Sequence, residues 1–541
     1  MYITVIKSEK KGKKYKSTLI RESYRDRGVV KNRTIANISD LPTELIRNIK
    51  SFLKGKQGDF NLSDLENGAV YEYGASYALK DLARQIGLEN AIFSSKTPWR
   101  ENIMAMIIGR ILYQGSKLSL INTFKDTALW ELAGHVYGKR PDVEKHCYQP
   151  MDELLSRKNK IEQKFAKKHF QNGCIVLYDI TNTWFEGEYK KSENVCYGRA
   201  KGGKHGYKQI ALGLLTNNEG CPVAVDIFKG STSDQTTVLD QVKKISKTYG
   251  IKEAVFTGDR GMLTQKRIDE IKETDFKIIT ALTHTELKTL IKKENIQMDL
   301  FDQMNITEVL DSEDKKTRYM LCKNDNEMQK EHNTRSKLIA KVEELLSIKA
   351  AVKRKRQIQE VSASVGRIFA KYKIEKFFSW KVGENGELSW NLKHDIIEKE
   401  EELDGCYVIK TDSSTELMSK QETVDSYRNL QKVEQAFKNM KTVMLELRPV
   451  YHKSDDRIKA HIFIVMLAYY LQWHAMQKLK PLFDEDGKGK DKRWTFEGII
   501  DRLKSIRKVE NLIDGTVVKT NISKLDEEQQ QILKLLEVKL T

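Results

Sequence analysis

The sequence has no long hydrophobic run and no secretion signal at its start. The apolar stretches Ile103–Leu112 and Ile462–Leu471 fall short of the roughly 18 residues that suggest a membrane span. Both adjoin charged residues, so we interpret them as buried helices. The opening residues, MYITVIKSEKKGKKYK, lack an apolar segment followed by a small-residue cleavage site. We therefore expect neither secretion nor membrane insertion.

Cysteine is scarce as well. The chain has six cysteines in 541 residues, and none of them forms a CxxC pair. This scatter predicts reduced thiols in a cytosolic protein. His205 lies between Cys196 and Cys221, but the spacing matches no zinc-finger pattern, so we expect no structural zinc site there. The full set is Cys147, Cys174, Cys196, Cys221, Cys322 and Cys406.

Acidic residues are outnumbered by basic ones. The sequence has 94 Lys and Arg against 76 Asp and Glu, a net charge of +18 and a pI near 9.2. Each basic cluster alone could be a solvated face, but their spread along the chain predicts an extended nucleic-acid surface. An anionic membrane would attract the same charge, yet no long basic amphipathic helix with an aromatic face stands out. The clusters are Lys7–Lys16, Lys201–Lys208, Lys353–Arg356 and Lys488–Arg493.

The middle of the chain alternates strand and helix patterns. Three apolar runs separated by turn residues predict antiparallel strands, and a helix, a strand, a helix and a strand follow. This order is that of a ribonuclease-H-like α/β core, a mixed sheet flanked by helices. The predicted elements are strands Cys174–Ile180, Tyr207–Leu215 and Pro222–Lys229, helix Thr236–Thr248, strand Glu253–Thr257, helix Gln265–Lys272 and strand Phe276–Leu282.

The pattern along the whole chain predicts six regions. A charged segment that contains a long helix and a hairpin interrupts the core. The core then continues with the strand GCYVIK. We expect a basic N-terminal module that could bind DNA over 1–66, a helical region over 67–170, the first part of the core over 171–282, an inserted domain over 283–403, the second part of the core over 404–480 and a helical tail over 481–541.

Two aspartates follow neighbouring strands of the predicted core. Asp179 ends an apolar strand, and Asp259 follows the strand Glu253–Thr257 between Gly258 and Gly261. Either residue alone could be an ordinary turn or capping aspartate. Carboxylates at the C-terminal ends of neighbouring strands converge, however. The pair therefore predicts a site for a hard divalent cation.

The stretch Ser426–Leu447 supplies a third carboxylate. At about 100° per residue, Glu434 shares one angular sector of the predicted helix with a tyrosine and two lysines. In isolation, the solvated face of an amphipathic helix would be the better explanation of this pattern. With the two aspartates, Glu434 completes a site at which two metals about 4 Å apart would support in-line phosphoryl transfer. The sector holds Tyr427, Lys438 and Lys441, and the adjoining apolar stripe holds Leu430, Val433, Phe437, Met440 and Met444.

Three blocks of the sequence resemble bacterial insertion-sequence transposases of the DDE type. They read LYDITNTWFEG, TGDRGM and YRNLQKVEQAFKNMK…LELRPVYH, and the similarity is strongest over about 170–290 and 400–475. The closest branch has a Tyr-(2)-Arg-(3)-Glu-(6)-Lys signature and an insertion domain before the third acid. The resemblance implies a ribonuclease-H-like fold, cleavage of transposon ends with two Mg²⁺ or Mn²⁺ ions, and strand transfer into target DNA. It further implies double-stranded DNA as partner, a homodimer in the synaptic complex, and a nucleoid-associated protein of the bacterial cytoplasm.

The resemblance also assigns roles to residues. Asp179, Asp259 and Glu434 become the metal-binding and catalytic triad. Tyr427 and Lys441 match the signature residues that contact DNA near the scissile end. Further candidate DNA contacts are Arg260, beside the second aspartate, Lys438 and Arg428.

One position departs from the signature. Leu430 stands where the signature has arginine. Arg428 lies nearby, but in a uniform helix it is about 120° from Glu434, so we do not expect it simply to substitute. Lys432 or Lys438 could cover the phosphate instead.

Two rival hypotheses remain open at this point. The chain could be a ribonuclease-H-like metal nuclease that cuts DNA without joining it. It could also be a basic DNA-binding protein that has lost catalysis. Other acids near the core, Glu416, Glu422 and Asp226, do not share the placement of Glu434 beside Tyr427 and Lys441.

Overall fold

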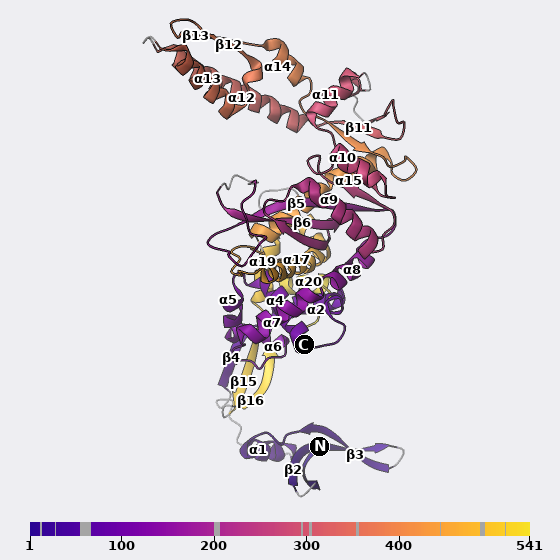
Figure 1. The fold of residues 1–541 in the computed structure, drawn as a ribbon. Helices are drawn as coiled ribbons and strands as arrows, with labels where there is room; N and C mark the ends of the chain where they lie inside the picture. The colour runs from indigo at the N-terminus through magenta and orange to yellow at the C-terminus, as the bar shows by residue number, and fades with distance from the viewer. Residues whose placement is uncertain are drawn as a thin grey trace. The chain divides into compact units, whose positions relative to one another are not determined.

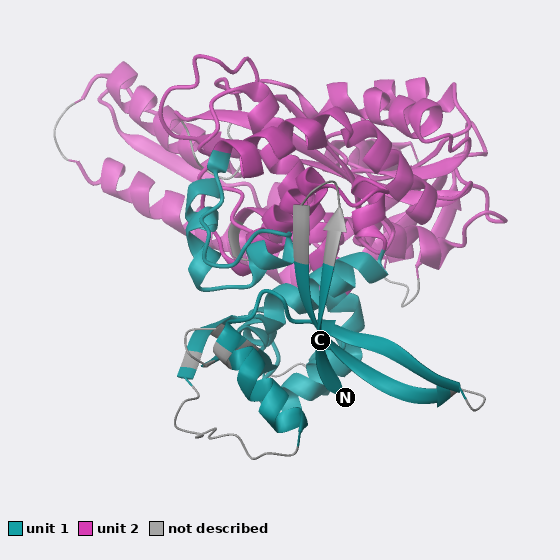
Figure 2. Cartoon of the chain, turned by 90° about the horizontal axis from the view of Figure 1, so that it is seen from below, with its two compact units in different colours: residues 1–86, 117–143, 475–541 teal, residues 87–116, 144–474 magenta. Residues whose placement is uncertain are grey.

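The chain forms two compact units (Figure 2). Unit 1 comprises Met1–Ile86, Lys117–Val143 and Ala475–Thr541, and unit 2 comprises Gly87–Ser116 and Glu144–His474. The predicted helical region 67–170 therefore contributes to both units. The computed structural model describes residues 1–10, 13–26, 29–54, 66–199, 206–293, 296–301, 306–352, 356–443, 445–486, 493–513 and 516–540.

Some of the predicted features lie outside the described residues. These are most of the basic clusters around 201–208, 353–356 and 488–493, together with Met444 of the apolar stripe. The stretch 55–65, at the end of the predicted N-terminal module, also lies outside them.

Unit 2 is organised around one eight-stranded sheet (Figure 1). Its strand order is β10-β11-β14-β9-β8-β5-β6-β7, and β5–β8 and β8–β9 are the parallel pairs. The part β7-β6-β5-β8-β9 has the order of a ribonuclease-H-like sheet, which confirms the predicted fold class. The strands are β5 Cys174–Phe185, β6 Lys208–Asn217, β7 Pro222–Lys229, β8 Ala254–Thr257, β9 Lys277–Ala281, β10 Thr307–Leu310, β11 Arg318–Lys323 and β14 Cys406–Thr411.

Helices pack against this sheet because its strands are almost continuously apolar. Strands β6 and β8 are buried along nearly all their length, as expected for strands covered on both faces. Helix α8 packs on β7, α16 on β5, and α15 on β9 and β14. The bounds are α8 Lys158–His169, α9 Asp234–Lys243, α10 Gln265–Lys272, α15 Lys420–Arg428, α16 Leu430–Lys438 and α17 Asp455–Lys478.

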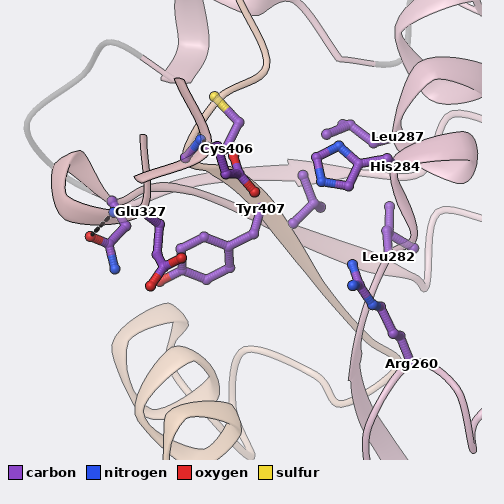
Figure 3. Close-up of a pocket in the computed structure, with 11 residues that line it drawn as sticks. Arg260, Leu282, His284, Leu287, Glu327, Cys406 and Tyr407 are labelled. Atoms are coloured by element: carbon purple, nitrogen blue, oxygen red, sulfur yellow. Dashed lines mark hydrogen bonds between the residues drawn. The ribbon is translucent and has the colours of Figure 1, made fainter. Parts of the chain in front are cut away.

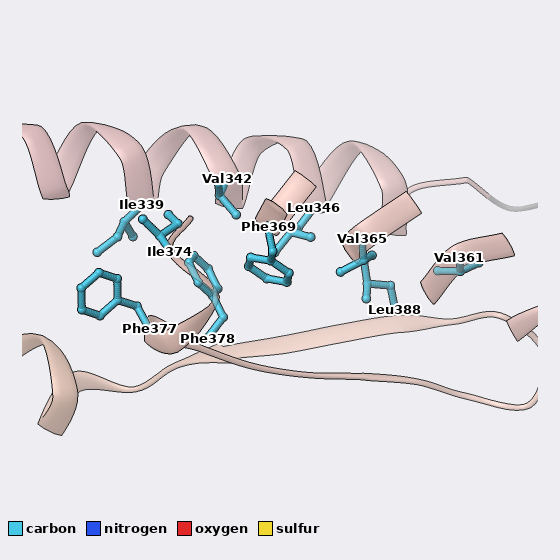
Figure 4. Close-up of a cluster of buried hydrophobic side chains, with 10 residues drawn as sticks. All are labelled: Ile339, Val342, Leu346, Val361, Val365, Phe369, Ile374, Phe377, Phe378 and Leu388. Atoms are coloured by element: carbon cyan, nitrogen blue, oxygen red, sulfur yellow. The ribbon is translucent and has the colours of Figure 1, made fainter. Parts of the chain in front are cut away.

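The predicted insertion does not begin as a separate domain. Its first strands, β10 and β11, extend the core sheet, and β11 pairs with β14. The segment beyond β11 has a hydrophobic core of its own, between α12 and the β12–β13 hairpin (Figure 4). It consists of α12 Asp325–Ala350, α13 Ile358–Tyr372, β12 Phe378–Val382, β13 Leu388–Leu392 and α14 His394–Glu401.

The C-terminal region of unit 1 differs from the predicted helical tail. Besides its helices it contains two strands, β15 and β16, which form a three-stranded sheet with β4. The sequence does show alternation around Asp514-Gly515, a hairpin-type dipeptide, but the partner strand β4 lies more than 400 residues earlier. The elements are β4 Glu66–Glu72, α18 Lys480–Glu485, α19 Phe496–Lys504, β15 Arg507–Ile513, β16 Thr516–Ile522 and α20 Glu527–Leu535.

The N-terminal module of unit 1 is a second small sheet. Three antiparallel strands in the order β1-β2-β3 are followed by one helix. The bounds are β1 Tyr2–Lys10, β2 Lys13–Asp26, β3 Val29–Asn37 and α1 Thr43–Leu53.

The remaining helices are divided between the two units: α2, α5 and α6 belong to unit 1, and α3, α4, α7 and α11 belong to unit 2. The apolar stretch around Ile103 is a buried helix, α4, as predicted, and the stretch around Ile462 lies in the buried part of α17. Among the helices that the structure describes, none has the length and apolar character needed to cross a bilayer. The bounds are α2 Gly74–Gln85, α3 Leu88–Ile92, α4 Pro98–Leu112, α5 Lys117–Asn122, α6 Leu129–Leu132, α7 Gln149–Ser156 and α11 His284–Lys292.

Candidate active site

The two aspartates occupy equivalent places relative to the parallel pair β5 and β8. Asp259 lies two residues beyond β8, as predicted, but Asp179 does not end its strand, because β5 stays paired with β6 as far as Phe185. Leu177 of β5 pairs with Thr257 of β8, so two residues further along each chain the same register reaches Asp179 and Asp259. The hydroxyl of Tyr178 bonds to α9, and successive residues of a strand face opposite sides. Asp179 therefore faces away from α9, on the other side of the sheet.

Glu434 reaches the same place from a helix. It lies on the exposed side of α16, whose opposite side buries Val433, Ala436 and Phe437. Because α16 packs on β5, the apolar side of the helix contacts the sheet. The carboxylate is left at the edge of the packed face, as the sequence predicts.

One cavity brings the three acids together. Its volume is about 380 Å³, many times the roughly 30 Å³ that a water molecule takes up in the liquid. A phosphate group with hydrated ions would therefore fit. The lining residues are Asp179, Asp259, Asn324, Tyr407, Tyr427, Arg428, Leu430, Gln431 and Glu434.

Local hydrogen bonds orient both aspartates. The backbone N–H of Ile180 donates to Asp179 Oδ1 at 2.7 Å, and that of Arg260 donates to Asp259 Oδ1 at 2.8 Å. Each carboxylate is thus held by the residue that follows it. In a tight turn after β8, the Asp259 carbonyl accepts from the backbone N–H of Met262.

Tyr427 stands among these acids. Its side chain is half-buried, and burial together with the nearby charge of Asp259 raises the pKa of Tyr427 to about 12. The phenol is therefore protonated at neutral pH. It can donate a hydrogen bond to an anionic ligand in the cavity.

Arg428 lines the cavity despite the helical geometry that argued against it. The helix is interrupted at Asn429, between α15 and α16, and the Asn429 carbonyl accepts a hydrogen bond from the N–H of Lys432. The Arg428 guanidinium donates to the Tyr407 hydroxyl at 2.9 Å. Because the helix is interrupted here, the long Arg428 side chain reaches the cavity wall at Tyr407, which it would not face on a uniform helix. Leu430, at the signature arginine position, also lines the cavity.

The other predicted DNA contacts lie elsewhere. Lys441 donates to the carbonyl of Asn182 at 2.7 Å and to the hydroxyl of Thr181, so it ties its segment to β5 just beyond Asp179. Lys438 is exposed on α16. Arg260 lines a second cavity that shares Asn324 and Tyr407 with the first (Figure 3).

Two of the competing acids, Glu422 and Asp226, have structural roles. Glu422 forms a capping box with Ser419 at the start of α15. Asp226 accepts from Lys158 at 3.2 Å and from Lys244 at 2.8 Å, and both lysines also pair with the fully buried Glu162. Although burial opposes its ionisation, the two lysines hold the pKa of Asp226 well below its usual range.

This buried network predicts acid sensitivity. Because the folded-state pKa of Asp226 is depressed, its stabilisation is complete above the unfolded value of about 3.9 and is lost as pH falls below it. We expect Asp226→Asn to lower the free energy of unfolding by about 2 kcal/mol at pH 7. The difference from wild type should shrink at pH 3. Urea unfolding at both pH values measures this, and Asp240→Asn, an exposed change on α9, is the control.

Three cavity residues were not identified from the sequence. Tyr407 lies on β14, Asn324 caps α12, and Gln431 lies on α16. Tyr407 is a half-buried position in an otherwise largely buried strand, and the only sequence signal for it is a hydroxyl-bearing side chain within the apolar run GCYVIK. Nothing local marks Asn324.

Comparison with known proteins gives the family. The model of the transposase DDE domain matches residues 171–471, more than half of the chain. The model of the IS1634 family transposase N-terminal domain matches residues 3–63. No curated protein matches the sequence.

Two solved structures give weak matches. The piggyBac transposase synaptic complex with hairpin DNA is 8% identical with a TM-score of 0.35, over 80% of this chain and 75% of that chain. The Mos1 transposase paired-end complex with the left transposon end is 13% identical with a TM-score of 0.15, over 44% and 67%. The assignment rests on the family models and the strand order. The chain belongs to the transposase DDE domain family and is a transposase of the insertion-sequence type.

Proposed function

We propose that this transposase cleaves DNA at the ends of its element and joins the 3′ ends to target DNA. The observation that carries the proposal is the single cavity lined by Asp179, Asp259 and Glu434. Hydrolysis would place a water in line with the scissile phosphorus and release a 3′-oxygen. Joining would use that 3′-hydroxyl as the nucleophile on a target phosphodiester.

The residues of the cavity fit divalent cations of the Mg²⁺ type. Three carboxylates, from β5, the loop after β8 and α16, offer the oxygen ligands that hard cations prefer. When bound there, two Mg²⁺ or Mn²⁺ ions would activate the attacking oxygen and stabilise the leaving one. We propose Asp179, Asp259 and Glu434 as their ligands.

The cationic and phenolic groups beside the acids would position the DNA. The Arg428 guanidinium can bind a phosphate in a bidentate way. It would make the phosphate contact that the signature arginine makes at the position of Leu430. Lys438 and Arg260 would contact the backbone at either side. Lys441 would position β5 through the hydrogen bonds it makes to that strand, or it would contact the end of the DNA strand after a local shift of its side chain.

Tyr427 should donate a hydrogen bond to a phosphate oxygen. Its high pKa keeps the proton on the phenol, and a bond to a charged group contributes about 1.5–3 kcal/mol. We expect Tyr427→Phe to slow single-turnover cleavage about tenfold to a hundredfold with unchanged folding. Tyr372→Phe, on α13 of the insertion, should leave the rate at the wild-type value. An equal loss in both variants would contradict a specific role for Tyr427.

We propose that the N-terminal sheet binds the transposon ends. Residues 1–54 carry fourteen Lys and Arg against five Asp and Glu, and nearly all side chains of β3 are exposed. A β-ribbon of this kind can enter the major groove, and the basic side chains would neutralise phosphates.

Three exposed residues of this sheet test that role. Changing Lys16, Arg25 and Lys31, all exposed, together to Ala should weaken binding to end DNA. The slope of log K against log salt should fall by about 0.9 for each lost phosphate contact. Fluorescence anisotropy over a salt series measures this. An unchanged slope would assign end binding to another region.

We propose a homodimer as the synaptic form, because one catalytic cavity in each chain would serve one transposon end. In this arrangement the core segments 171–282 and 404–480 carry the chemistry, and the insertion 283–403 lies between them in the chain. Sedimentation with and without end DNA tests the stoichiometry. Two chains bound to two ends is the expected result.

A strand-transfer assay tests the main proposal. The DNA flanking the gene is first sequenced for inverted repeats, and these repeats supply the substrate ends. With pre-cleaved ends, Mg²⁺ and a supercoiled plasmid, joined product is expected. Cleavage of uncut ends without any joined product would instead indicate a nuclease, and neither activity would indicate a protein that only binds DNA.

A further inference from the structure

A cluster of nitrogen and sulfur ligands lies in unit 2, apart from the three catalytic acids. His169 ends α8, Cys221 precedes β7, and His474 lies near the end of α17. Their ligand atoms all lie within 4.8 Å of one another. Within the part of the chain that the structure describes, these three side chains form the group whose ligand atoms lie close enough together to hold one metal ion.

The spacing suits a tetrahedral metal. The Cys221 sulfur is 3.8 Å from His169 Nε2, and ligand atoms around a zinc ion with bonds of about 2.0–2.3 Å are about 3.3–3.6 Å apart. The Tyr470 hydroxyl lies 3.0 Å from the same Nε2. An ion here would displace that hydrogen bond and take the hydroxyl or a water as its fourth ligand.

The surroundings favour a soft or borderline cation. Imidazole nitrogen and thiolate sulfur are the ligand types that such cations prefer. Aromatic rings close the site, with Tyr470 stacked on Phe165 at 4.3 Å between centroids. Cys221 is fully buried, whereas His169 and His474 are half-buried.

The cluster is connected to the helix that carries Glu434. Cys221 closes the β6–β7 turn, and in that turn Asn218 accepts hydrogen bonds from Asn429 and from Lys432 of α16. Gly220, with φ +83°, approaches Lys432 so closely that a Cβ there would be 2.8 Å from the lysine Cβ. A bond to Cys221 would therefore fix the turn on which the start of α16 rests.

We propose that His169, Cys221 and His474 bind one Zn²⁺ ion, which has a structural role and holds the β6–β7 turn in place under α16. This site differs in chemistry from the catalytic cavity, because Mg²⁺ prefers oxygen ligands and imidazole with thiolate suits Zn²⁺. It is independent of the proposed DNA cleavage. Its ligands come from three separate segments, so no local spacing motif marks it.

Metal analysis of the full-length chain tests the proposal. After incubation with Zn²⁺ and dialysis against Mg²⁺ buffer, about one zinc per chain should remain, and Cys221→Ser and His474→Gln should each retain less than a fifth of it. Cys174→Ser, on β5, and Glu434→Gln, in the catalytic cavity, should both keep the zinc. Loss of zinc in Glu434→Gln instead would place the ion among the acids and overturn the proposal.

Two measurements cover the case in which a variant misfolds. Zn²⁺ should raise the thermal unfolding temperature of the wild-type chain by several degrees at fixed Mg²⁺, since a ligand of the folded state stabilises it. The Co²⁺-loaded wild-type chain should show a thiolate-to-cobalt charge-transfer band in the near ultraviolet. No retained zinc and no shift in unfolding temperature would overturn the proposal.

Discussion

Replacing any one of Asp179, Asp259 and Glu434 with Ala is expected to reduce Mg²⁺-dependent cleavage of end DNA by about a thousandfold or more. Each acid comes from a different element and lines the same cavity, so the other two cannot supply the missing ligand. The loss should appear in the single-turnover rate. Binding of end DNA should change little, because the basic surface is intact.

The design of this experiment separates catalysis from folding. Asp269→Asn, an exposed acid on α10, is the matched control and should cleave at the wild-type rate. Glu434→Gln keeps the size of the side chain and should be as inactive as Glu434→Ala. Cleavage that persists in all three Ala variants would remove the catalytic assignment altogether.

The largest effect on stability is expected at Arg318. This residue of β11 is 2% exposed. Its guanidinium makes two hydrogen bonds to Glu308 of β10, at 2.7 and 3.1 Å, and two to the carbonyls of Ser413 and Met418, at 3.0 and 2.9 Å. Arg318→Ala leaves a carboxylate and two carbonyls without this partner, which should lower the free energy of unfolding by about 3–5 kcal/mol.

Two further variants sharpen that result. Arg318→Lys keeps the charge but not the planar fork, so it should recover only part of the loss. Lys316→Ala, exposed in the turn before β11, should change stability by less than about 0.5 kcal/mol. Urea unfolding followed by circular dichroism compares the three. Equal midpoints for Arg318→Ala and Lys316→Ala would show that the buried network adds nothing to stability.

The catalytic core was predictable because its determinants are local. The apolar runs that contain Asp179 and precede Asp259 predict the two neighbouring strands, although β5 continues past its predicted end at Ile180 to Phe185. The amphipathic period of α16 places Glu434 at the margin of its packed face. The parallel pairing of β5 with β8 brings the two aspartates together, and the packing of α16 on β5 adds Glu434.

The remaining features depend on contacts between distant segments. The sheet of β4, β15 and β16 joins both ends of the chain, and no local pattern indicates such a partner. Arg428 enters the cavity because the helix is interrupted at Asn429, a detail that an ideal helical wheel omits. Asn324 and Tyr407 line the cavity because β11 and β14 are neighbours in the sheet, which only the tertiary structure shows.

The pairing of β11 with β14 has a consequence for protein engineering. Lys323 pairs with Cys406, and the N–H of Asn324 donates to the carbonyl of Gly405 at 2.9 Å, so the two ends of the segment 325–404 already meet like the arms of a hairpin. The segment has its own hydrophobic core. A short turn or another domain could therefore replace this segment without moving the strands beside which the three acids lie.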